Sequence, residues 1–196
     1  MDKLFGNLHR VLLVGLILAI VVALILHADQ LGTHAFWAFV IRWIHVWFGI
    51  LWIGLLYYFN FVQIPSMPKI PDEQKPAIGK VIAPAALFYF RWAAAGTVLF
   101  GLLTALMDPT GPGYLLNALT FQADRATIGI GMWLALIMAF NVWFIIWPNQ
   151  KKALGLVDAD ADTKKKAARV AMLTSRTNTL LSIAMLYCMV AQGNVG

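Results

Sequence analysis

The chain has 196 residues, of which 61% are hydrophobic and 12% are charged, whereas an ordinary soluble domain has roughly 45–50% and 25%. This composition excludes a typical soluble protein and also an intrinsically disordered one, because so apolar a chain would bury its surface or aggregate. The lone cysteine, Cys188, excludes an internal disulfide and a multi-cysteine metal site, and no CxxCH motif is present to attach a c-type haem. The formal net charge of +6 is compatible with nucleic acid or with a membrane topology, depending on where the cations lie.

Five stretches of the chain are long and apolar enough to span a membrane. They lie at residues 11–27, 37–63, 83–107, 126–147 and 177–192, and a span needs about 20 mostly apolar residues to cross a hydrocarbon core of about 30 Å. We therefore expect an all-α integral membrane protein in which residues 1–196 form a single membrane domain, a bundle of five transmembrane helices. A poor cleavage site follows the first stretch, so we expect a retained anchor rather than a signal peptide.

The lysines and arginines lie mostly on one side of these predicted spans. Twelve of the fifteen fall in the N-terminus, the second loop or the fourth loop, namely Lys3, Arg10, Lys69, Lys75, Lys80, Lys151, Lys152, Lys164, Lys165, Lys166, Arg169 and Arg176. The positive-inside rule then places the N-terminus in the cytoplasm and the C-terminus outside. Because topology explains the cations and no groove-reading motif is present, we expect no nucleic-acid partner.

The predicted loops carry their own signals. Residues 64–80 contain four prolines, which disfavour helix in the residues before them, so we expect an ordered or extended strap. The outer loop begins with turn residues at 108–113, and a short interfacial helix is expected at 114–121. The fourth loop is rich in aspartate but lacks the glycine and closing glutamate of an EF-hand, which favours the capped start of a cytoplasmic helix over a calcium loop.

One face of the second predicted span carries unusual side chains. Arg42, His45, Gly49 and Trp52 follow helical spacing, and His45 is the only histidine deep in a span. One interpretation makes His45 an axial ligand to the iron of a b-type haem, with Gly49 giving room for the ring and Arg42 lying near a propionate. The other is a histidine hydrogen-bonded to a neighbouring helix, as intramembrane polar residues often are.

The sequence offers two candidates for the second axial ligand of such a haem. Met132 in the fourth predicted span and Met189 in the fifth reach a depth similar to that of His45. Methionines at this spacing are usually packing residues, so the sequence does not choose between them.

A second polar cluster is expected in the cytoplasmic half of the bundle. It comprises Arg91, Asn60, Asn141, Arg176 and Asn178, and no aspartate or glutamate lies within any predicted span. The amides would therefore have to compensate the Arg91 guanidinium. The cluster is either a pocket for an anion, a substrate or a haem propionate, or an internal hydrogen-bond clamp that fixes the helix register. The lack of intramembrane carboxylates argues against a proton-driven transporter.

Four strings of the sequence resemble a known family. They are IHVWFGILWIGLLYYFNFVQ at residues 44–63, FRW at 90–92, NVWFIIWPNQK at 141–151 and SRTNTLLS at 175–182. These strings are similar to the membrane domain of the bacterial membrane-bound urate oxidases, the urate oxidase N-terminal (PuuD-like) family, and the resemblance spans about residues 37–192. It implies a multi-pass protein of the bacterial inner (cytoplasmic) membrane with a periplasmic C-terminus. It also implies a polar interior formed by His45, Arg91, Asn60, Asn141, Arg176 and Asn178.

The resemblance further implies a redox activity. The family carries a cytochrome c domain after its membrane domain and passes electrons from urate to a respiratory chain. Since this sequence has no CxxCH motif, the expectation is either a urate oxidase-like oxidoreductase that hands electrons to a separate cytochrome c, or a chain that has kept only the membrane scaffold.

Two functional hypotheses remain from the sequence. In the first, the five-helix bundle binds haem b at His45 and moves electrons from urate or another small anion. In the second, the chain is a non-catalytic accessory subunit of a larger respiratory or photosynthetic membrane complex. Small residues at 93–96, 101, 129 and 131 also permit the close helix contacts of a homo-oligomer. A permease is disfavoured, because the sequence shows no internal repeat and no broken helices.

Overall fold

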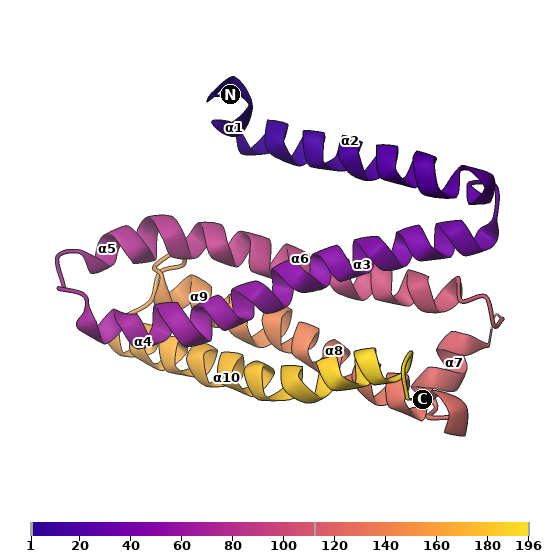
Figure 1. The fold of residues 1–196 in the computed structure, drawn as a ribbon. Coiled ribbons are helices and arrows are strands. Elements are labelled where there is room, and N and C mark those ends of the chain that lie inside the picture. The colour runs from indigo at the N-terminus through magenta and orange to yellow at the C-terminus, as the bar shows by residue number, and fades with distance from the viewer. Residues whose placement is uncertain (1, 112, 196) are drawn as a thin grey trace.

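The computed structural model describes residues 2–111 and 113–195, and every regular element in this part of the chain is helical (Figure 1). Three short segments, η2, η4 and η6, are π-helical, whereas η1, η3 and η5 are 3-10 turns. The elements are α1 (Asp2–Phe5), α2 (Leu8–His27), η1 (Ala28–Gln30), α3 (His34–Tyr57), η2 (Tyr58–Gln63), α4 (Ile64–Ser66), η3 (Met67–Lys69), α5 (Lys75–Ala77), η4 (Ile78–Ile82), α6 (Ala83–Leu106), α7 (Tyr114–Leu119), η5 (Ala123–Arg125), α8 (Ala126–Phe140), η6 (Asn141–Ile146), α9 (Trp147–Ala153) and α10 (Ala161–Ala191).

Four helical stretches of the described chain are long and apolar enough to cross a membrane. They are Leu8–Gln30, His34–Lys69, Lys75–Leu106 and Ala123–Ala153, and they contain the first four predicted spans except for the last residue of the third. The fifth prediction, at 177–192, lies in α10 except for its last residue, and α10 is 31 residues long. Its length suffices for a span, but the polar run at 174–179 makes α10 less apolar than the other four stretches.

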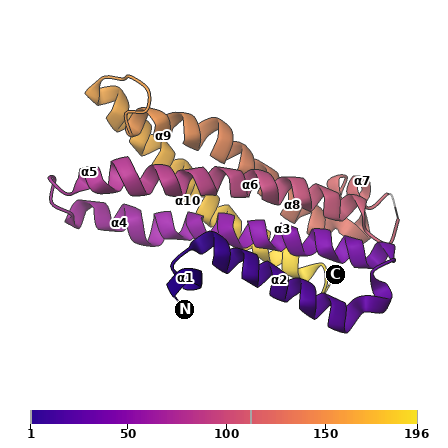
Figure 2. The same ribbon diagram turned by 90° about the horizontal axis from the view of Figure 1, so that it is seen from above.

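The core of the bundle lies between α3, α6, α8 and α10. Figure 2 shows α3 and α6 running side by side. The largest side chains in the core include Trp52 and Leu56 of α3, Phe90 of α6 and Met138 of α8, all of which are fully or almost fully buried. In contrast, α2 contains no buried residue, and it lies apart from the other helices in Figure 1. The site-bearing part of the molecule is therefore the bundle from α3 onward.

Each π-helical segment ends two residues before a proline. Pro65 follows η2, Pro84 follows η4 and Pro148 follows η6. Proline has no N–H group to donate, and its ring clashes with the carbonyl of the fourth residue before it. The widened turn accommodates this clash without ending the helix, which is why the three long stretches continue through their prolines.

The predicted strap at 64–80 was wrong for most of its length. The helix that begins at His34 continues to Lys69, and the next begins at Lys75. Pro76 lies in the first turn of the helix that begins at Lys75, where a missing N–H costs little. Pro65 and Pro68 lie within the helix that continues to Lys69, after the π-helical turn of η2. Only residues 70–74 connect the two helices.

The other two loop predictions were confirmed as helices. The short outer helix expected at 114–121 is α7, and it packs on α8 through a hydrogen bond from Trp133 Nε1 to the backbone oxygen of Leu119 (3.1 Å). The helix start expected in the fourth loop is that of α10, where the Asp160 carboxylate accepts from the backbone N–H of Thr163 (2.8 Å). The hydrogen bonds from the side chain and the backbone N–H of Thr163 lower the pKa of the Asp160 carboxyl. The Asp160 side chain that caps α10 therefore stays ionised at neutral pH.

Candidate functional site

A cavity of about 780 Å³ lies between α3, α6, α8 and α10, at the end of the bundle that carries α7. All four residues predicted as a cofactor site from the second span line this cavity: Arg42, His45, Gly49 and Trp52. Most of the remaining lining side chains are aliphatic or methionine, and the polar ones gather toward the α7 end. The structure therefore places the predicted set in one apolar chamber with a polar mouth.

His45 is held by a bond to the neighbouring helix. Its Nδ1 atom lies 2.8 Å from the backbone oxygen of Thr97 in α6. A carbonyl oxygen can only accept, so Nδ1 carries the proton and donates it. In the neutral imidazole the lone pair then belongs to Nε2, which makes Nε2 available to a metal ion or to another hydrogen-bond donor. This arrangement combines the two interpretations of His45, because a bond to a neighbouring helix leaves the second nitrogen free.

The imidazole of His45 packs closely against a glycine in α6. A Cβ atom added at Gly101 would lie 2.9 Å from Cε1 and 3.1 Å from Nδ1 of His45, closer than real Cβ atoms approach. A Cβ atom at Gly49 would meet only Cγ2 of Thr97, at 4.0 Å. The room for a haem ring expected at Gly49 stays a prediction, whereas the close contact of the His45 imidazole is with Gly101. A sequence search could have found Gly101 only as one small residue among several in its span.

The mouth of the cavity carries two guanidinium groups. Arg42 NH2 lies 3.8 Å from an oxygen of Asp108. Arg125, which the sequence analysis did not name, lies with its guanidinium carbon 4.6 Å from the ring centroid of Tyr114 and donates to Thr110 Oγ1 (3.3 Å). Both cations line the cavity. Asp108 and Arg125 were missed because they lie at the ends of predicted spans, where a charged residue is unremarkable by sequence.

Trp52 and Tyr114 complete the polar part of the lining. Trp52 is 0% exposed, and its Nε1 is buried without a hydrogen-bond partner among the described residues. Burial and the nearby carboxylate of Asp108 raise the pKa of the Tyr114 phenol, so its hydroxyl remains a donor at neutral pH. A buried donor without an acceptor is costly, and the Trp52 indole N–H is such a donor in a residue that lines the cavity.

Both methionines considered as the second axial ligand of a haem also line the cavity. Met132 projects from α8 and Met189 from α10. The sequence analysis had inferred a similar depth for these residues and for His45, and the structure places all three around one space. Met185 joins them from α10.

The residues of the second predicted cluster lie in three separate places, two of which are built around asparagines and one around Arg91. Asn141 Nδ2 donates to Asn178 Oδ1 (2.8 Å), and Asn178 Nδ2 donates to the backbone oxygen of Met138 (3.0 Å). Asn60 Nδ2 donates to Ser175 Oγ (2.8 Å) and to the backbone oxygen of Leu56 (2.9 Å). The Asn178 contacts join α10 to α8 and η6, while the Asn60 contact joins η2 to α10. Both pairs form the kind of interhelical clamp that fixes helix register.

The two arginines of this cluster lie away from the Asn141–Asn178 pair. The guanidinium carbon of Arg91 lies 3.9 Å from the ring centroid of Trp147 and 5.4 Å from that of Phe88. The Arg91 cation is thus compensated by aromatic faces rather than by amides. Arg176 is exposed and lines a surface groove with Asn60.

One family model matches the C-terminal part of the chain: residues 113–193 match the urate oxidase N-terminal family. The matched part contains the predicted strings at 141–151 and 175–182, so the resemblance is confirmed there, whereas the strings at 44–63 and 90–92 lie outside it. Asn141, Asn178 and Arg176 are thus within the family match, and His45 is not. No curated protein and no solved structure matches the chain.

Proposed function

We propose that the protein is a membrane redox protein that binds haem b in the His45 cavity and transfers electrons to a separate partner. The observation that carries this proposal is the bond from His45 Nδ1 to the Thr97 carbonyl, because it presents Nε2 as a free ligand within an apolar cavity. Metal-binding histidines commonly donate their other ring N–H in this way, which fixes both the tautomer and the ring orientation.

The residues around the cavity fit the chemistry of a haem. The imidazole supports an axial bond to iron, and the aliphatic walls suit a porphyrin ring. Arg42 and Arg125 lie at the polar mouth, where guanidinium groups suit the two propionates. Met132 and Met189 offer thioether sulfurs on other walls. The bound group would supply one-electron redox chemistry, and the protein would hold it, orient it and shield its apolar ring from water.

The proposed topology places this cavity near the outer surface. We take α10 as the fifth span and the N-terminus as cytoplasmic, since the loops at the far end of the bundle carry most of the lysines and arginines. In this orientation the cavity opens toward the periplasm of a bacterial inner membrane, where a separate soluble cytochrome c is accessible. The family match supports urate, or another small organic anion, as the source of electrons.

The alternative function is that of a non-catalytic accessory subunit. One observation favours it, since α2 has no buried residue and most of its apolar side chains are exposed. A helix of this kind contacts lipid or another membrane protein. An accessory subunit would copurify with a larger assembly at fixed stoichiometry and would be colourless when isolated.

The absorption spectrum of the purified chain distinguishes the two functions. The full-length protein in detergent is measured oxidised and dithionite-reduced, and its haem is quantified after extraction. We expect about one haem per chain in the wild type and in His34→Ala, whose histidine is exposed at the start of α3, and none in His45→Ala. A wild-type protein purified from haem-replete cells without a Soret band would contradict the redox proposal.

A further inference from the structure

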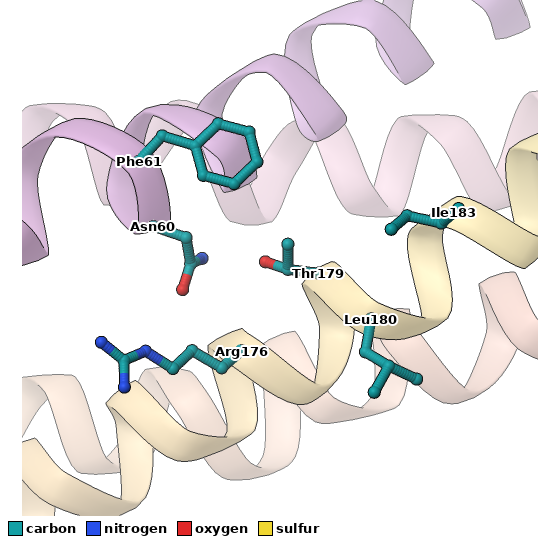
Figure 3. Close-up of a pocket in the computed structure, with 6 residues that line it drawn as sticks. All are labelled: Asn60, Phe61, Arg176, Thr179, Leu180 and Ile183. Carbon is teal, nitrogen blue, oxygen red and sulfur yellow. The ribbon is translucent and has the colours of Figure 1, made fainter.

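A groove of about 400 Å³ lies between η2 and α10, away from the His45 cavity. Figure 3 shows the six residues that line it, three with polar side chains and three with apolar ones: Asn60, Arg176, Thr179, Phe61, Leu180 and Ile183. None of these residues lines the His45 cavity, so the groove is independent of the proposed redox function.

The apolar side of the groove faces outward from the bundle. Phe61, Leu180 and Ile183 are 65%, 69% and 68% exposed. In a membrane-spanning bundle, large apolar side chains this exposed contact lipid acyl chains or another membrane protein. The groove is therefore a notch in the outer surface of the bundle and not an internal chamber.

Arg176 places a positive charge in this notch. It is exposed, and it takes part in none of the ion pairs found in the described chain. A charge on the surface of a membrane span is expensive unless it reaches a partner or the headgroup layer. The partner that an unpaired guanidinium lacks is an anion.

Asn60 adds a hydrogen-bond acceptor that lacks a donor. Its Nδ2 atom makes two hydrogen bonds, but its Oδ1 atom is buried without a donor among the described residues. In Figure 3 the Asn60 oxygen is directed toward the side of the groove where Arg176 lies. A ligand that offers an anion to Arg176 and, once the Asn60 side chain turns toward the groove, a hydroxyl or N–H donor to Oδ1 would meet both requirements.

The depth of Arg176 matches the headgroup layer. It precedes Gln192 by 16 residues of α10, about 24 Å along the helix, and Gln192 binds the backbone N–H of Ile128 near the opposite end of the bundle. A hydrocarbon core is about 30 Å thick. The long side chain of Arg176 can span the remaining distance and reach the phosphate layer at the basic end of the bundle.

We propose that this groove binds the headgroup of an anionic phospholipid that carries hydroxyl groups, of the phosphatidylglycerol class. Arg176 holds the phosphodiester through charge-assisted hydrogen bonds. A headgroup hydroxyl donates to Asn60 Oδ1, and an acyl chain lies along Phe61, Leu180 and Ile183. An ethanolamine headgroup fits less well, because its ammonium would lie beside Arg176 and the lysines at this end.

Native mass spectrometry of the full chain in detergent tests the proposal. Protein delipidated and then incubated with phosphatidylglycerol or phosphatidylcholine is compared for retained lipid. We expect the wild type to retain one phosphatidylglycerol in preference to phosphatidylcholine. Arg176→Gln should weaken that retention about tenfold, as loss of a charge-assisted bond does, and Arg176→Lys should weaken it less.

The matched control is Arg169→Gln, which removes another exposed cation from the same helix outside the groove. It should retain the lipid as the wild type does. Equal loss in both variants would overturn the proposal in favour of general charge attraction, and equal retention of the two lipids would overturn it as well. Binding of inorganic phosphate that displaces the lipid at equal concentration would show a small-anion site instead. If Arg176→Gln does not fold, the lipid comparison in the wild type and Arg176→Lys decides.

Discussion

His45 and Thr97 connect α3 to α6 through a single bond of 2.8 Å between an imidazole nitrogen and a backbone oxygen. The acceptor belongs to the main chain, so the orientation of the imidazole depends on the packing of two helices and not on the side chain of residue 97. Packing at this contact is close because Gly101, one turn after Thr97, has no side chain to collide with the imidazole. The position of Nε2 in the cavity is therefore set by the α3–α6 interface.

This arrangement predicts different effects for two glycines. In Gly101→Ala, the new methyl group would lie 2.9 Å from His45 Cε1, so the imidazole must shift. Overpacking of this kind costs about 1–3 kcal/mol, and we expect haem affinity to fall by about tenfold or more. Gly79→Ala is the control, because its methyl group would make only an ordinary 4.0 Å contact with Leu154 and Gly79 does not line the cavity. Haem titration of both variants checks this, and equal affinities would show that the ring does not depend on Gly101.

The cations at the mouth should matter more than the cation deep in α6. Arg42→Gln and Arg125→Gln each remove a guanidinium that lines the cavity, so each should weaken haem retention by about tenfold, as loss of a charge-assisted bond does. Arg91→Gln should leave retention unchanged, because Arg91 packs on Trp147 instead. The rate of haem transfer to apomyoglobin measures retention. A larger effect at Arg91 than at the two mouth residues would contradict the assignment of the propionate side.

The Asn141–Asn178 pair should contribute to the stability of the bundle. Asn178 is 0% exposed and makes two bonds across the α8–α10 interface. Interhelical hydrogen bonds in membranes are worth about 0.6 kcal/mol on average and up to about 1.7. We expect Asn178→Ala to lower the free energy of unfolding by about 1–2 kcal/mol, and the double variant with Asn141→Ala to show coupling. Unfolding in mixed micelles measures both, with Asn194→Ala, whose side chain is exposed, as the neutral control.

The packing of α7 against α8 depends on a glycine in α8. A Cβ atom added at Gly129 would collide with the backbone oxygen of Ala118 in α7, and backbone cannot move aside as a flexible side chain can. We expect Gly129→Ala to displace α7 and to weaken the bond from Trp133 to Leu119. Gly54→Ala meets nothing within 4 Å and serves as the control. Protease sensitivity at residues 113–122 reports the displacement, and unchanged cleavage in Gly129→Ala would contradict it.

Most of the long helices could be predicted from the sequence, because a membrane span requires a sufficiently long and apolar stretch of residues. The first four stretches, the short helix after Tyr114 and the capped start of α10 were all readable in this way. The strap at 64–80 was wrong because the rule that proline disfavours helix does not account for first-turn positions or for π-helical turns. α10 is less apolar than the other spans partly because Ser175, Asn178 and Ser182 are buried against other helices.

Only part of the candidate site could be predicted from the sequence, for a different physical reason. Helical spacing brought Arg42, His45, Gly49 and Trp52 onto one face, since that depends on a single helix. The partners of these residues come from other helices, and single-helix spacing carries no information about them. Thr97 contributes a backbone atom, and Gly101 contributes the absence of a side chain. For the same reason, the sequence could not show that Arg91 faces Trp147 while Asn141 faces Asn178.

Restoration of haem binding by free imidazole is the measurement that tests the role of His45 most directly. His45→Gly removes the side chain and leaves a space of its shape beside Gly101 and the Thr97 carbonyl. The account predicts that the purified variant gives no Soret shift with haemin, and that added imidazole restores the wild-type spectrum. A His45→Gly protein that binds haemin as tightly as the wild type without imidazole would show that the iron ligand lies elsewhere.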